Sequence, residues 1–326
     1  MPRLTLAIFP GRGKSASRFA GGPPHTLSCL SAPDGGGGDL ATEKGQKVVW
    51  FQAAGCTGCS ISLMNSSYPD LVNLLLDELV PGKGITLLFH ATLMGPTGRP
   101  ALELLDRVPR EAAGQYVLVV EGALPTGHEN FGRVGEVPMA ARAAELARKA
   151  IAVVAMGSCA SYGGIPAGAP NPAGCIGMGE LLRQEGIGVP VINVPGCPPH
   201  PRWFVETLVT VLARGLPAPE ELDDAGRLRN VYSGLIHEHC PRRPDFDVAR
   251  FAPYFGEQGC LYELGCRGPF TNAACPEHAW NGGVNWCIRA GHPCIGCTEP
   301  DFPDRFSPFF RKLSLEEELM TYRRQG

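Results

Sequence analysis

The residues of this chain with the clearest potential for chemistry are its thirteen cysteines, spread over 326 positions. An odd number of cysteines in a chain of this length argues against a purely disulfide framework. Thiolates also bind zinc and iron–sulfur clusters, so metal binding becomes the leading interpretation. Two groups stand out: four cysteines that follow apolar runs between residues 48 and 197, and seven between Cys240 and Cys297.

The first group is tied to predicted strands. Cys56 and Cys59 follow the first strand, Cys159 follows the fourth and Cys197 the fifth, each with a glycine nearby. Ligands of an open α/β sheet gather outside the carboxyl ends of its strands, so these four thiolates can meet around one centre. Such a set can hold an iron–sulfur cluster, structural zinc or two disulfides. Ligands from three distant strand ends favour the cluster, because zinc ribbons usually draw theirs from two local knuckles.

The second group lies in a segment dense in Cys, Gly, Pro and Trp, with few long apolar runs. Such a segment can hardly build an oil-like core, so we predict a second domain stapled by cofactors. Four cysteines before it and seven within it make eleven ligands, and one histidine would complete three sets of four. His237, three residues before Cys240, has a suitable spacing.

The elements that must position these residues alternate regularly in the first part of the chain. Strand-like runs lie at 48–51, 86–89, 116–120, 151–155 and 189–194, and helix-like runs lie between or after them, such as those at 71–80, 139–150 and 202–213. Strands that are apolar throughout suit a sheet covered on both faces. We therefore predict an α/β fold with a parallel, flavodoxin-like sheet, followed by a small irregular domain.

The predicted organisation has five segments. They are a flexible leader at 1–46, a flavodoxin-like domain at 47–216, a polar linker at 217–230, a C-terminal cluster domain at 231–312 and a tail at 313–326. The leader is rich in Gly and Pro and has no apolar periodicity. It shows no recognisable export signal, because its apolar run at 4–9 is short and ends at Pro10.

Charge argues against a nucleic-acid partner, and hydropathy argues against a transmembrane segment. The chain has 29 Lys+Arg against 32 Asp+Glu and a net charge of -3, so it lacks the basic footprint of a nucleic-acid-binding protein. No window approaches the roughly 20 apolar residues that cross a bilayer. We expect neither a nucleic-acid partner nor a transmembrane segment.

Several short motifs together resemble the small subunit of nickel–iron hydrogenases, close to the nickel–iron–selenium type. They are GCTGCS at 55–60, VEG at 120–122, GSCASYGGIP at 157–166, PGCPPHP at 195–201, GCRGP at 265–269 and WNGGVNWC at 280–287. The resemblance spans residues 48 to about 310, and the order and joint presence of the motifs make it specific.

The resemblance implies three iron–sulfur clusters. It assigns a proximal 4Fe-4S cluster to Cys56, Cys59, Cys159 and Cys197, a distal 4Fe-4S cluster to His237, Cys240, Cys260 and Cys266, and a medial cluster to Cys275, Cys287, Cys294 and Cys297. Many relatives have Pro at the position of Cys287 and a 3Fe-4S medial cluster. The cysteine here implies a 4Fe-4S medial cluster instead.

The resemblance also implies a function in hydrogen metabolism. The partner would be a large subunit whose nickel–iron centre interconverts H2 with two protons and two electrons, and no residue of this chain would be catalytic. This chain would carry electrons to an acceptor docking near His237, such as a c-type cytochrome or a ferredoxin. By resemblance the protein works on the periplasmic side of the cell envelope, and the missing export signal leaves the cytoplasm as the alternative.

Two other functions stay open at this point. The nearer one is an electron-transfer subunit of the respiratory complex I type, which typically has adjacent cysteines and lacks the second domain. The other is a zinc-stapled interaction protein, which would be colourless whereas an iron–sulfur protein is brown.

Four further features have competing interpretations. Glu121 ends a strand on the cluster side and resembles a family residue near the proximal cluster. There it would pass protons or tune the potential of the cluster, or it would simply be a buried, hydrogen-bonded residue. Cys29 and Cys175 match no motif and read as incidental thiols. The tryptophans, at 50, 203, 280 and 286, read as packing residues rather than electron stepping stones.

Overall fold

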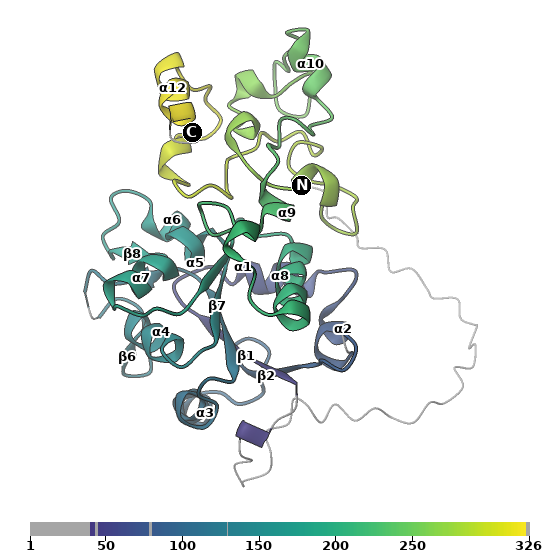
Figure 1. Ribbon diagram of the computed structural model, residues 1–326. Coiled ribbons are helices and arrows are strands. Elements are labelled where there is room, and N and C mark those ends of the chain that lie inside the picture. The colour runs from purple at the N-terminus through teal and green to yellow at the C-terminus, as the bar shows by residue number, and fades with distance from the viewer. Residues whose placement is uncertain (1–39, 43–44, 78–79, 129, 324–326) are drawn as a thin grey trace, which may run out of the picture.

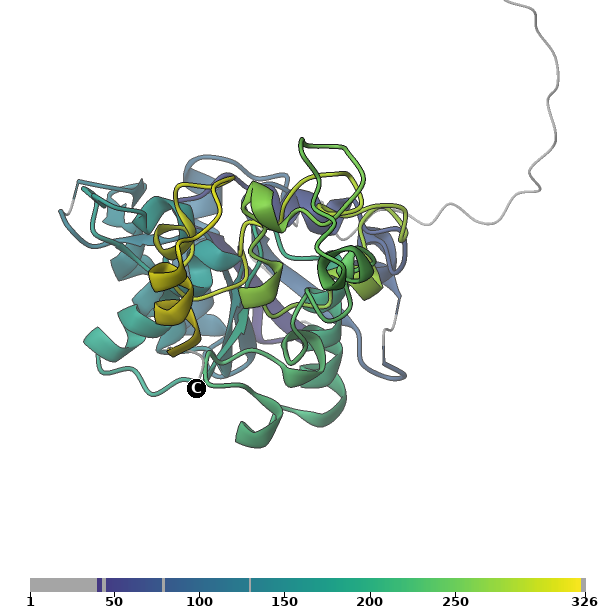
Figure 2. The same cartoon turned by 90° about the horizontal axis from the view of Figure 1, so that it is seen from above.

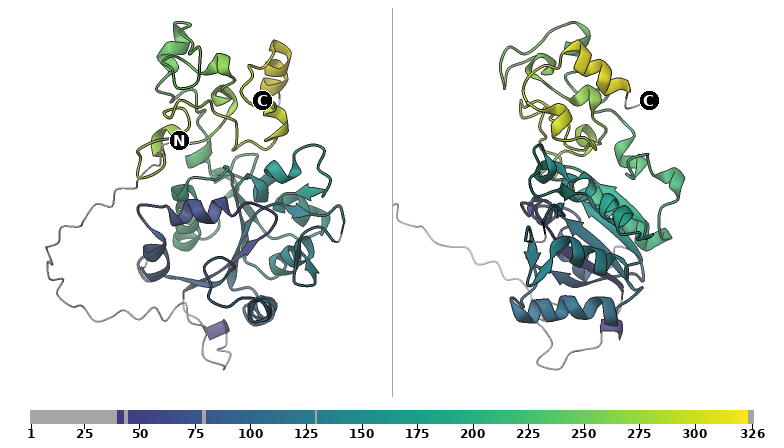
Figure 3. Two further views of the ribbon diagram at one scale, coloured as in Figure 1. Left: turned by 180° about the vertical axis from the view of Figure 1, so that it is seen from behind. Right: turned by 90° about the vertical axis from the view of Figure 1, so that its left-hand side faces the viewer.

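The computed structural model describes residues 40–42, 45–77, 80–128 and 130–323. Cys29 and almost all of the predicted leader lie outside these residues. The described chain forms an α/β part and a C-terminal part, residues 229–323, which lies over one end of the sheet (Figures 1 and 3). Seen from above, the segments of the C-terminal part cover that end (Figure 2).

The α/β part is built on a five-stranded parallel sheet. Its strands are β1 (Gln46–Gln52), β2 (Ile85–His90), β3 (Tyr116–Glu121), β7 (Ala152–Met156) and β9 (Val191–Val194), in the order β2-β1-β3-β7-β9. All five predicted strands are therefore present, with ends shifted by one or two residues. The order is that of flavodoxin-like sheets, so the predicted fold class is confirmed.

Helices cover both faces of the sheet. They are α1 (Gly58–Met64), α2 (Leu71–Leu76), α3 (Arg99–Glu111), α4 (Met139–Ala147), α5 (Ser158–Tyr162), α6 (Gly164–Ala167), α7 (Met178–Gln184) and α8 (Pro201–Arg214). Successive residues of a strand point to opposite faces. Val48 of β1 accordingly joins the core that contains Trp203 of α8, while Val49 joins the other core with Leu105 of α3. Every residue of the central β3 is buried.

Two predicted helices differ in extent from the observed ones. The run predicted at 71–80 ends as a helix at Leu76, since Asp77 already has extended backbone. The run predicted at 139–150 ends at Ala147. Helix α3 was not predicted, because Pro100 and Pro109 interrupt its pattern. Pro100 stands in the first turn, where its missing N–H is not needed, and Pro109 lies inside the helix, close to its end.

Two small ladders flank the sheet: β4 (Leu124–Pro125) pairs with β8 (Cys175–Ile176), and β5 (Arg133–Val134) pairs with β6 (Val137–Pro138). The loops between them lie at the side of the α/β part, near α4, α6 and α7 (Figure 1).

The C-terminal part is mostly loops. Its helices are α9 (Arg229–Tyr232), α10 (Arg243–Asp247), α11 (Cys275–His278) and α12 (Leu315–Arg323). It also contains three short 3-10 helices, η3 (Tyr262–Leu264), η4 (Gly268–Phe270) and η5 (Asp304–Phe306). Two more, η1 (Leu40–Thr42) and η2 (Pro219–Glu221), lie outside the C-terminal part. Buried residues such as Ile236, Leu261 and Trp286 belong to the same core as Trp203 of α8. The two parts therefore share one core. None of the described helices is long and apolar enough to span a membrane.

The predicted linker and the predicted ends of the chain contain more structure than their composition suggests. Strand β1 begins at Gln46, inside the predicted leader, and α12 occupies most of the predicted tail. In the linker, Arg227 is only 6% exposed, and its backbone forms an isolated parallel β-bridge with Asn193 of β9. The linker thus lies against the edge of the sheet.

Candidate cofactor-binding site

The four cysteines predicted at the strand ends lie together, and we call Cys56, Cys59, Cys159 and Cys197 the sheet-end set. Cys59 lies on α1 after β1, Cys159 lies on α5 after β7, and Cys197 lies three residues after the end of β9. Burial raises the pKa of the Cys59 thiol, and Glu121 and the other three thiols of the set raise it further. The structure therefore brings all four into one electrostatic neighbourhood.

Glycines allow the backbone to approach these sulfurs closely. A Cβ added to Gly157 would come within 2.5 Å of Cys59 Sγ, and Gly157 has a φ of +89°, which disfavours other residues. A Cβ on Gly58 would come within 3.0 Å of Cys56 Sγ. Both positions leave room beside the sulfurs only because they lack a side chain.

Glu121 lies buried at the end of β3, 3% exposed, and its carboxylate holds the start of α1. Its Oε1 accepts hydrogen bonds from the backbone N–H groups of Cys59 (3.0 Å) and Ser60 (3.1 Å). Its Oε2 accepts from Trp50 Nε1 (3.0 Å) and from the Ser60 hydroxyl. Both oxygens of the Glu121 carboxylate thus have hydrogen-bond donors, so the geometry favours a role in positioning the start of α1.

Three of the C-terminal cysteines, Cys240, Cys260 and Cys266, form the outer set. Burial raises the pKa of Cys266 to about 12, and the Cys240 and Cys260 thiols raise it as well. The Gly268 backbone N–H donates to Cys266 Sγ at 3.5 Å, and the Arg242 N–H donates to Cys240 Sγ at 3.4 Å. These backbone donors would stabilise thiolates.

His237 lies next to the outer set along the chain. Its carbonyl accepts from the Cys240 N–H at 3.4 Å, and its ring packs edge-on against Phe246 with centroids 4.6 Å apart. Burial lowers the pKa of His237, and Arg243 lowers it further. The imidazole thus favours the neutral form, which is the form that binds metals.

The middle set consists of Cys275, Cys287, Cys294 and Cys297. Burial raises the pKa of Cys275 well above its usual value, and the other three thiols add to the effect. The structure therefore groups Cys287 with the other three. The Gly296 N–H donates to Cys294 Sγ at 3.5 Å.

The three sets form a row. Burial raises the pKa of Cys297 to about 12, while a hydrogen bond from the Cys197 backbone lowers it and the nearby Cys197 thiol raises it. The sheet-end and middle sets therefore touch. The N–H of Arg267, next to Cys266, donates to the Cys294 carbonyl at 2.8 Å, which joins the outer set to the middle set. The middle set lies between the other two.

The donors fit iron–sulfur clusters. All twelve cysteines that the structure describes are free thiols. Buried thiolates need positive charge nearby, which iron would supply, and thiolates are the usual ligands of such clusters. Within the described ranges, no group of three or more Cys, His, Asp or Glu is spaced to hold a single metal ion.

Of the remaining residues singled out from the sequence, Cys175 lies apart from the three sets and the tryptophans pack among other side chains. Cys175 is buried on β8, and its backbone N–H donates to Asn171 Oδ1 at 2.7 Å. Trp203 and Trp280 pack against the ring of His200. Two residues of the site were not predicted, Ser158 and Arg227. Ser158 could have been noticed as the neighbour of Cys159, whereas no local signal marks Arg227.

Comparison with known proteins agrees with this geometry. Residues 232–310 match the family described as NiFe/NiFeSe hydrogenase small subunit, C-terminal, and residues 56–211 match the family described as NADH ubiquinone oxidoreductase, 20 Kd subunit. The chain is 42% identical to the periplasmic [NiFeSe] hydrogenase small subunit of Desulfomicrobium baculatum, over 81% of this chain and 86% of that protein. It is 40% identical to the periplasmic [NiFe] hydrogenase small subunit of Solidesulfovibrio fructosivorans, over 84% of each.

Solved structures give the same result. The reduced, active Ni-Fe-Se hydrogenase of Desulfomicrobium baculatum matches with a TM-score of 0.77 and 42% identity, covering 83% of this chain and 100% of that chain. The recombinant [NiFeSe] hydrogenase of Desulfovibrio vulgaris Hildenborough, in its oxidised state, matches with a TM-score of 0.75 and 39% identity, covering 83% and 99%.

A flavodoxin-like sheet with three adjoining cysteine sets defines an iron–sulfur electron-transfer subunit. The chain belongs to the small subunits of nickel–iron hydrogenases. It is the electron-transferring part of an oxidoreductase and pairs with a hydrogenase large subunit. The complex I alternative accounts for residues 56–211 only, and neither it nor the zinc alternative is favoured.

Proposed function

We propose that the three cysteine sets hold three 4Fe-4S clusters, and that electrons pass along the row one at a time. The observation that carries this proposal is the contact of the middle set with both other sets. The hydroxyl of Ser158, next to Cys159, donates to the Cys297 carbonyl, and the N–H of Arg267, next to Cys266, donates to the Cys294 carbonyl at 2.8 Å. Each cluster, when bound, accepts and releases single electrons. The protein contributes their spacing, their burial and the hydrogen bonds to their sulfurs.

The sheet-end set is the proposed proximal site, facing the large subunit. Cys56 and Cys197 are exposed, and the apolar residue Ile61, on the same helix as Cys59, is 49% exposed. A shallow cavity of about 380 Å³ adjoins them, lined by Gly58, Ile61, Ser62, Asn65, Pro198, Pro201, Trp280 and Asn281. Exposed apolar surface beside exposed ligands suits a protein–protein interface that excludes water from the cluster.

The middle set is the proposed medial site, with four thiolate ligands. Cys287 supports a fourth iron because it lies in the electrostatic neighbourhood of Cys275 and Cys297. A thiolate can bind that iron, whereas Pro at this position would offer no side-chain donor.

The outer set, completed by His237, is the proposed distal site and the point of electron exit. A neutral imidazole on the same loop as Cys240 supplies a fourth ligand of the correct kind. The proposed redox partner is a small electron carrier, a c-type cytochrome or a ferredoxin, that docks near His237.

The proposal is tested by removing one ligand and one unrelated cysteine. Cys56→Ala should lower the iron content of the purified complex and abolish H2-dependent reduction of an added acceptor. Cys175→Ala, the matched control, removes a buried thiol outside the three sets and should leave both quantities unchanged. Full iron content and full acceptor reduction in Cys56→Ala would contradict the assignment.

A further inference from the structure

The hydroxyl of Ser158 joins backbone segments that carry cysteines of two different sets. Ser158 directly precedes Cys159 and is 1% exposed. Its Oγ accepts a hydrogen bond from the Gly196 N–H at 2.9 Å and donates one to the carbonyl oxygen of Cys297. Its own N–H donates to the Gly196 carbonyl at 3.0 Å. One side chain therefore touches the loops of Cys159, Cys197 and Cys297.

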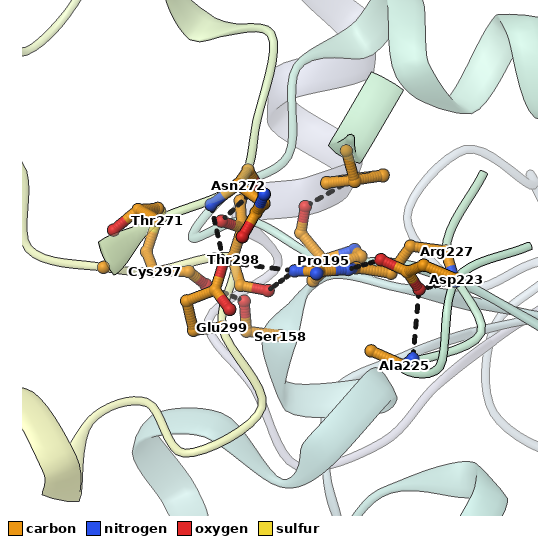
Figure 4. Close-up of polar contacts among 12 residues, drawn as sticks. Ser158, Pro195, Asp223, Ala225, Arg227, Thr271, Asn272, Cys297, Thr298 and Glu299 are labelled. Carbon is orange, nitrogen blue, oxygen red and sulfur yellow. Dashed lines mark hydrogen bonds and ion pairs between the residues drawn. The ribbon is translucent and has the colours of Figure 1, made fainter. Parts of the chain in front are cut away.

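This contact lies where the sheet-end and middle sets meet. Ser158 belongs to α5, and Cys297 belongs to the C-terminal part, 139 residues further along the chain. Figure 4 shows the two residues side by side. From Cys159 to Cys297, the path consists of one peptide bond, the Ser158 side chain and a single hydrogen bond.

A separate group of contacts holds the neighbouring residues in place. Arg227 Nη1 donates to the Thr298 carbonyl at 3.1 Å and pairs with Glu299 at 3.2 Å, while its Nε pairs with Asp223 at 2.7 Å (Figure 4). Glu299 also accepts from the Asn272 N–H at 2.7 Å. These ion pairs fasten the loop after Cys297 to the α/β part without Ser158. The Ser158 hydroxyl can therefore be removed while the two parts stay attached.

We propose that Ser158 is a positioning residue that fixes the relative placement of the sheet-end and middle sets, and with it electron transfer between their clusters. The inference rests on the proposed assignment of a cluster to each set. Loss of the hydroxyl frees the Cys297 carbonyl from the α5 segment and removes one of the hydrogen-bonded connections between the two sets. It also leaves the Gly196 N–H without its acceptor.

The test compares Ser158→Ala with Ser161→Ala in the complete complex. Ser161 is a matched control, because it is buried on the same helix and its hydroxyl donates to the Ala155 carbonyl at 3.1 Å, inside the α/β part. Two readouts are needed besides iron content: the magnetic interaction between the two clusters in the reduced complex, and the rate at which H2 reduces the medial cluster in freeze-quenched samples.

We expect Ser158→Ala to keep its iron, to show a weaker magnetic interaction and to reduce the medial cluster several-fold more slowly. Ser161→Ala should match the wild type, and Ser158→Thr, which keeps a hydroxyl, should recover most of the rate. If Ser158→Ala does not assemble, Ser158→Thr and Ser158→Val form a pair of similar shape that differs in the hydroxyl, and the same readouts decide.

Two results would overturn the inference: an unchanged interaction and rate in fully loaded Ser158→Ala, or equal changes in Ser158→Ala and Ser161→Ala. Failure of the underlying assignment looks different. In that case the wild-type complex itself would lack two interacting clusters.

Discussion

The carboxylate of Glu121 accepts a hydrogen bond from the backbone N–H of Cys59 at 3.0 Å, which ties the end of β3 to the start of α1. The same carboxylate accepts from Ser60 and Trp50. Burial lowers the pKa of the adjacent His90 to about 4, so the imidazole that contacts Ser60 is neutral near pH 7. The cluster side of the sheet is thus held by one carboxylate that accepts hydrogen bonds from several surrounding donors.

Glu121→Gln should therefore destabilise the complex and loosen the proximal site. A glutamine would turn an N–H2 group toward several donors, and hydrogen bonds to a charged acceptor contribute about 1.5–3 kcal/mol each to stability. Thermal denaturation and iron content measure the effect, with the half-exposed Glu185→Gln as the control. If Glu121→Gln kept its stability and its iron but altered the pH dependence of H2 oxidation, a proton-passing role would replace the positioning role.

The His237 assignment predicts a separation of two activities. His237→Ala should slow H2 oxidation coupled to an external acceptor, because electrons leave through the outer set. Hydrogen–deuterium exchange at the large subunit should continue, because it needs no electron exit. His292→Ala, which alters a histidine packed against Phe310 in the C-terminal part, serves as the control. Equal loss of both activities in an assembled His237→Ala complex would refute the exit role.

The Cys287 assignment predicts the type of the medial cluster. In the oxidised wild-type complex, electron paramagnetic resonance should show no stoichiometric 3Fe-4S signal. Cys287→Pro should gain that signal and raise the potential of the medial cluster, since cluster type and net charge help to set it. A full 3Fe-4S signal in wild type prepared without oxygen would show that Cys287 is a spare thiol.

The buried ion pairs of Arg227 predict a large effect on stability at the junction of the two parts. Arg227→Met would leave the buried Glu299 and the partly buried Asp223 without their cation, and breaking a buried pair typically costs about 3–5 kcal/mol. Denaturation of the complex should show the loss. Arg183→Met, which breaks an exposed pair with Glu180, should cause little change. Similar midpoints for the two variants would mean that the junction does not depend on Arg227.

The sequence predicted the features that depend on local patterns. Continuous apolar runs marked the five strands, and the cysteines that follow three of them marked the sheet-end set. Helix α3 was missed because its prolines resemble breaks, although one stands in the first turn and the other lies near its end. Helix α12 was missed because the predicted tail was assigned no structure.

Features that depend on distant contacts could not be predicted. Arg227 lies in a polar segment that reads as an exposed linker, and its partner Glu299 is 72 residues away. The hydrogen bond from Ser158 to Cys297 spans 139 residues. How the C-terminal ligands divide into two sets was implied by family resemblance. The row that the sets form required the structure, because the C-terminal part has little periodic secondary structure.

The most direct test of three clusters in this chain is metal analysis of the complex purified without oxygen, corrected for the metals of the large subunit. Twelve proposed ligands predict about twelve iron atoms in this chain and no stoichiometric zinc. Stoichiometric zinc with negligible iron would contradict the account.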